Sequence, residues 1–127
     1  MDHNQHMAMA RRILAGLAKL DPELDRFAII DGTMVAAYHL GNAALHAHGV
    51  TEASLHFNTP SKFEVPPESL PEALKRIYLA FDALEKLRSR YVRSPDAPDV
   101  DSVRSAQHQL AQMAQFCGMN EASGLPQ

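Results

Sequence analysis

A long and almost wholly apolar stretch runs from Phe27 to Ala47 and constrains the fold more than any other part of the sequence. With about 100° of rotation per residue, its polar residues gather into one strip roughly 80° wide. These residues are Asp31, His39, Asn42 and His46. A helix with so wide an apolar surface needs partners on several sides. We expect it either at the centre of a bundle or in a further interface, and we favour a homodimer through this apolar face.

The same stretch is long enough to span a bilayer, but its polar residues argue against that placement. An Asp at mid-membrane costs roughly 2.5–3.5 kcal/mol, so we interpret the segment as a buried core helix. The single cysteine, Cys117, excludes an intramolecular disulfide and suits a reducing compartment. The N-terminus lacks the basic and apolar regions of a secretory signal. We therefore expect a cytoplasmic protein with no membrane partner.

Apolar residues recur at helical spacing in four segments, and β-branched residues are scarce beside Ala and Leu. Asp21-Pro22 separates the first two segments, and Gly49 and Gly118 are suited to end helices. The sequence therefore predicts an all-α, up-down bundle in one domain, residues 1–127, with residues 121–127 as a loose tail. The helices are expected at about residues 5–20, 22–48, 70–92 and 100–117.

The longest connection, residues 50–68, lacks helical periodicity and is predicted to be an irregular crossover. The favoured interpretation is an apolar flap packed over one end of the bundle. A lid or binding loop, and a short hairpin around residues 58–61, are the alternatives.

Arg88 falls near the middle of the apolar stripe of the third predicted helix, between Leu84 and Tyr91. An unpaired buried guanidinium would cost several kcal/mol, so Arg88 needs a partner or access to solvent. Asp31 is the expected partner. The alternative is an anion-binding arginine, supported by the neighbouring Arg90 and Arg93, although such clusters also complement the C-terminal dipole of a helix.

The ending of the third helix, Leu87-Arg88-Ser89-Arg90-Tyr91-Val92-Arg93, together with the long second helix and irregular crossover, resembles the HEPN family of helical bundles. RNase members of that family carry an Arg followed after four residues by a His. Here Arg93 stands where the His belongs, so the resemblance implies a non-catalytic dimeric bundle that binds a nucleotide, RNA or a protein. The ligand-binding candidates are Arg88, Arg90, Arg93, Asp31 and Tyr91.

The histidines offer a separate and less favoured site. His39 and His46 share one helix face but lie about 10 Å apart along the axis, so a metal would need a donor from another element. The candidates for this additional donor are Asp82, Glu85 and His56. We expect no metal and no cofactor, with His3 and His6 in a frayed N-terminus.

Three functions remain open at this stage. The first is a HEPN-like binding protein that holds a nucleotide or RNA phosphate at the basic end of the third helix. The second is a protein–protein interaction or structural dimer module without a small ligand. The third is a metal or small-molecule enzyme that uses His39, Asn42 and His46. Because no serine has a nucleophile-elbow motif, catalysis is the least supported of the three.

Overall fold

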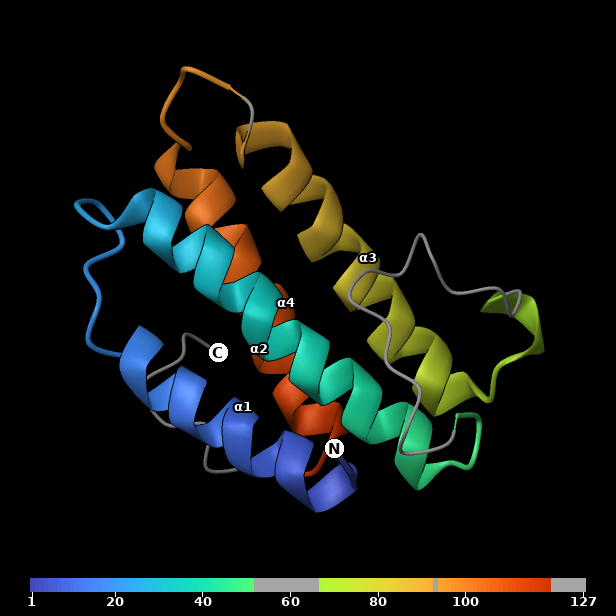
Figure 1. The fold of residues 1–127 in the computed structure, drawn as a ribbon. Helices are drawn as coiled ribbons and strands as arrows, with labels where there is room; N and C mark the ends of the chain where they lie inside the picture. The colour runs from blue at the N-terminus through green and yellow to red at the C-terminus, as the bar shows by residue number, and fades with distance from the viewer. Residues whose placement is uncertain (52–66, 93, 120–127) are drawn as a thin grey trace.

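The computed structural model describes residues 1–51, 67–92 and 94–119, and within them the chain is an all-α bundle (Figure 1). The helices are α1 (His3–Leu17), α2 (Arg26–Ala47), α3 (Glu72–Val92) and α4 (Val100–Phe116). A short 3₁₀ helix, η2 (Pro67–Ser69), precedes α3. The predicted fold class is confirmed. The predictions for the crossover core, for Arg93 and for the tail fall on residues 52–66, 93 and 120–127, which lie outside the described residues.

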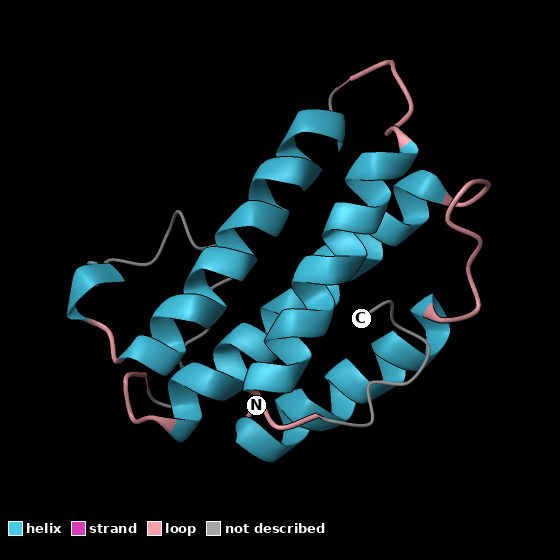
Figure 2. Cartoon of the chain, turned by 180° about the vertical axis from the view of Figure 1, so that it is seen from behind, coloured by secondary structure: helices cyan, strands magenta, loops and turns pink. Residues whose placement is uncertain are grey.

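Successive helices run up and down the bundle, as Figures 1 and 2 show from opposite sides. The α1–α2 and α3–α4 connections therefore lie at the same end. The N-terminus of α1, the C-terminus of α2 and the N-terminus of α3 lie at the other end. This arrangement separates the two groups of candidate functional residues.

Helix α2 is the central element, because it packs against each of the other three helices. The backbone of α1, by contrast, approaches that of α2 alone among the described helices. Of the two arrangements expected for the apolar helix, the central position is the one observed. The homodimer through its apolar face remains a prediction, and within one chain the exposed large apolar side chains on α2 are Phe27 and Val35.

No described helix combines the length and the apolar character that crossing a membrane requires.

Several helix boundaries differ from the prediction by a few residues, and the starts of α1 and α2 do so for identifiable reasons. Helix α1 starts earlier than expected, because Asp2 and Gln5 form a capping box in which each side chain accepts a hydrogen bond from the other residue's backbone N–H. Helix α2 starts later, at Arg26 rather than at residue 22. The Asp21 carboxylate accepts hydrogen bonds from the backbone of Glu23 and Leu24, which closes a separate turn before the helix.

The predicted helix ends at glycines are confirmed. Gly49 and Gly118 follow α2 and α4 with φ angles of 69° and 85°, in the left-handed region that favours glycine.

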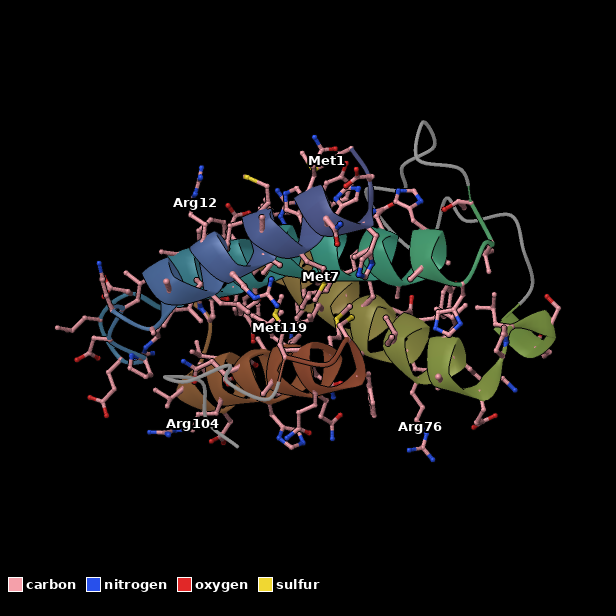
Figure 3. All side chains as sticks on the ribbon, turned by 90° about the horizontal axis from the view of Figure 1, so that it is seen from below. Met1, Met7, Arg12, Arg76, Arg104 and Met119 are labelled. Carbon is pink, nitrogen blue, oxygen red and sulfur yellow. The ribbon has the colours of Figure 1, made fainter. Side chains whose placement is uncertain are left out.

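Apolar side chains from all four helices meet in a single core around α2. Met7 of α1 and Met119, which follows α4, both point into this interior (Figure 3). Gly41 on α2 makes room for a side chain, since a Cβ atom there would lie 3.0 Å from Cδ2 of Phe81 on α3.

Candidate functional site

Arg88 forms the ion pair that its place in the apolar stripe predicted. Its Nε atom on α3 donates to Asp31 Oδ1 on α2 across 2.8 Å. Both side chains remain part-exposed, at 41% for Arg88 and 43% for Asp31. The pair therefore joins two helices at the edge of the bundle, and the predicted partner of Arg88 is confirmed. Whether Arg88 also binds a ligand stays a prediction.

Arg90, the other basic candidate among the described residues, lies near an aromatic ring and an acidic group. The Arg90 guanidinium sits over the Tyr91 ring, 5.2 Å from its centroid, and the Tyr91 hydroxyl lies 3.0 Å from Ser102 Oγ on α4. Hydrogen bonds from Ser102, chiefly from its backbone N–H, hold the pKa of the Asp99 carboxyl below its ordinary value, and the charge of Arg90 adds to this effect. The positive charge at the end of α3 is thus partly balanced by α4.

An open groove lies at this end of the bundle, between the α1–α2 connection and the α3–α4 connection, and has a volume of about 510 Å³. Arg26 bridges the two connections, because its side chain donates to the carbonyl oxygens of Glu23 at 2.8 Å and Pro98 at 3.3 Å. The apolar side chains that line the groove are Leu24, Phe27, Tyr91, Val92, Pro95, Ala97 and Pro98.

Large apolar side chains around this groove face solvent. Leu24 is 84% exposed, and Phe27 and Val92 are each more than 40% exposed. Scattered exposed apolar residues are ordinary, but several that converge on one groove are typical of an interaction surface. This groove could not be predicted from the sequence, because it is built from two connections that are far apart along the chain.

A second unusual arrangement lies at the opposite end of the bundle, where α1 meets the C-terminal half of α2. His6 was expected in a frayed N-terminus, and that expectation is wrong: its side chain is fully buried. Its Nδ1 atom lies 3.0 Å from Nδ1 of His39, which is 7% exposed. His46 is also close, with its ring centroid 5.3 Å from that of His6. Helix α1 thus places a third imidazole, that of His6, beside His39 and His46 of α2.

Polar side chains of other residues contact His6, His39 and His46. Tyr38 packs edge-on against both His6 and His39, at 5.8 and 4.8 Å between ring centroids. His46 Nδ1 lies 2.9 Å from the Thr51 hydroxyl. In the part of the chain that the structure describes, no group of three or more His, Cys, Asp or Glu side chains has an arrangement that could hold a metal ion.

Cys117 is partly buried and packs against the apolar core. Its thiol lies 3.6 Å from the carbonyl oxygen of Leu40, and burial raises its pKa to about 12. A thiol in such surroundings stays protonated at neutral pH, which disfavours a nucleophilic role.

No family model, no curated protein and no solved structure is significantly similar to this chain.

Proposed function

We propose that this chain is a helical-bundle interaction protein that binds a second copy of itself through the groove between its two same-end connections. The observation that carries the proposal is Leu24, an 84% exposed side chain beside a groove lined by other apolar residues. Fully burying a leucine contributes about 1.5–3 kcal/mol, so exposed leucine beside an apolar groove favours association.

The charges at the groove support a second copy as the occupant. Glu23 and Asp96 line it together with Arg26, so both signs are present on one patch. In a twofold dimer the same patch faces itself, and Arg26 of one copy can lie against a carboxylate of the other. A nucleotide or RNA phosphate would instead meet two carboxylates at this groove. Among the described residues, Arg88 and Arg90 support the phosphate alternative, and each already contacts a protein group.

The groove is also held in shape before binding. The two hydrogen bonds from Arg26 fix the α1–α2 connection to the α3–α4 connection. A surface that is already ordered loses less conformational entropy when a partner binds. The proposal agrees with the dimer implied by the HEPN resemblance, although it places the interface at the end of the bundle rather than on the apolar face of α2.

Sedimentation equilibrium on the wild type and three glutamate variants tests this proposal. We expect a wild-type dimer that Leu24→Glu converts to a monomer. Leu79→Glu is the matched control, because Leu79 is 57% exposed on α3 and does not line this groove. Val35→Glu tests the α2 face, where Val35 is 44% exposed. Circular dichroism verifies that each variant keeps its helix content.

The outcomes separate the alternatives. Loss of the dimer in Leu24→Glu alone supports the groove, and loss in Val35→Glu alone overturns it in favour of the α2 face. A wild type that stays monomeric at all concentrations also overturns it. In that case a rise in melting temperature with short RNA or nucleotide, abolished by Arg88→Ala, would support the phosphate-binding alternative.

A further inference from the structure

The hydrogen bond between His6 and His39 limits how many protons these two imidazole rings can bind. Two imidazole nitrogens at 3.0 Å share one proton, so one Nδ1 donates and the other accepts. When both rings are doubly protonated, neither nitrogen can accept. The bond is then lost, and two positive charges lie within 5.2 Å of each other between ring centroids.

Burial makes the charged forms costly as well. His6 is fully buried and His39 is 7% exposed, so an imidazolium at either position loses most of its hydration. The titratable groups that contact this pair from α2, among the described residues, are Tyr38 and His46. From α1, His3 lies one turn away, with its Nδ1 atom 2.9 Å from the carbonyl oxygen of Ala43. A proton on His46 would add a like charge close to His6.

The position of the pair gives this limit a structural consequence. The pair lies in the interface between α1 and α2, and the backbone of α1 approaches no other described helix. Any loss of contact there therefore weakens the attachment of α1 to the rest of the bundle. The central helix keeps its contacts with α3 and α4.

We infer that the His6–His39 pair is a proton-operated latch, which holds α1 on α2 at neutral pH and releases it as the pH falls. The direction of this pH dependence follows from proton linkage. Histidines in the released state take up protons near pH 6.5, whereas the docked pair takes up fewer. The docked state is therefore fully stable above about pH 6.5 and loses stability below it. One excess proton raises the opening equilibrium constant of α1 about tenfold per pH unit, and two raise it about a hundredfold.

Native-state hydrogen exchange of the full chain, corrected for intrinsic exchange rates, measures this opening directly. Between pH 6 and pH 5 we expect the opening constants of α1 amides to rise at least tenfold, while those of α3 amides change less. In His39→Gln, which cannot be protonated, the rise should fall to one third or less of the wild-type value. His108→Gln, at an exposed position on α4, is the matched control and should behave as wild type.

The wild type alone provides a second test that does not depend on a variant folding well. NMR titration follows the imidazole protons of the native protein as the pH falls. The signals of His6 and His39 should change only together with the release of α1. The latch is refuted if α1 opening is independent of pH between 7 and 5, or if His6 and His39 titrate while α1 stays protected.

Discussion

The Arg88 guanidinium and the Asp31 carboxylate, 57 positions apart in the sequence, meet at 2.8 Å and tie α3 to α2. Both groups keep more than a third of their side-chain surface in solvent. The pair therefore belongs with partly exposed ion pairs, whose attraction is weakened by water and salt. A fixed carboxylate at this distance also means that an anionic ligand of Arg88 must compete with Asp31.

We expect the coupling between these two residues to be small. In a double-mutant cycle of Arg88→Ala and Asp31→Ala, measured by urea unfolding, the interaction free energy should be about 0.2–1 kcal/mol and should decrease in 1 M salt. Arg90→Ala, which removes an exposed neighbour, serves as the control. A salt-independent coupling of several kcal/mol would contradict this account.

Substitution by alanine should raise the stability of the protein at Gly16 and lower it at Gly41. Gly16 is a helical residue of α1 with open space where a Cβ would lie, so Gly16→Ala should stabilise the protein by about 0.5–1 kcal/mol. At Gly41 the new methyl group would press on the buried ring of Phe81. Overpacking of this kind costs about 1–3 kcal/mol, so Gly41→Ala should lower the melting temperature.

Thermal unfolding of both variants at neutral pH checks this pair. Gly41→Ala combined with Phe81→Leu should lose less stability than the two single changes together, because the smaller side chain makes room for the methyl group. An equal rise in melting temperature for both glycine variants would show that Phe81 does not fill the space beside α2.

The N-cap of α4 should depend on acid pH. Because the pKa of Asp99 is lowered in the folded chain, its stabilisation is present above its unfolded pKa of about 4 and is lost as the pH falls through the folded value. Asn caps helices as well as Asp but does not titrate. Melting temperatures between pH 5 and pH 2 should therefore fall further in the wild type than in Asp99→Asn. Parallel decreases in the two proteins would contradict this role.

Cys117 should resist thiol reagents until the bundle opens. With its pKa raised to about 12, the thiolate fraction at pH 8 is about a thousandfold lower than that of an ordinary cysteine. A disulfide reagent at pH 8 should modify native protein very slowly, and protein in denaturant rapidly. The denatured chain is its own control, and rapid modification of the native protein would contradict the burial of this thiol.

The sequence was sufficient for the fold, because a period of 3.6 residues and terminal signals such as Gly49 and Gly118 act locally. It also placed Arg88 opposite Asp31, since a charge inside an apolar stripe must find a partner. Boundary errors arose where side chains close small local structures, as at Asp2 and Asp21, because alternative caps were available nearby.

The candidate sites were harder to predict, because they depend on which helices face each other. His6 is separated from His39 by 33 positions, and nothing local distinguishes a buried N-terminal histidine from a frayed one. The spacing of His39 and His46 shows that a metal would need a donor from another element, but it does not point to α1. The groove beside Leu24 likewise forms only when residues 23–27 are brought together with residues 91–92 and 94–98.

The central position of α2 has a consequence for the protein during its synthesis. Helix α2 is complete at Ala47, but the two helices that cover its remaining apolar faces end at Val92 and Phe116. At about 5–20 residues per second, a ribosome needs on the order of 3–14 s to add that remainder. For those seconds the faces of α2 that α3 and α4 cover in the folded chain lack these partners. Sequences that slow elongation after residue 47 should therefore increase chaperone capture and aggregation of this protein.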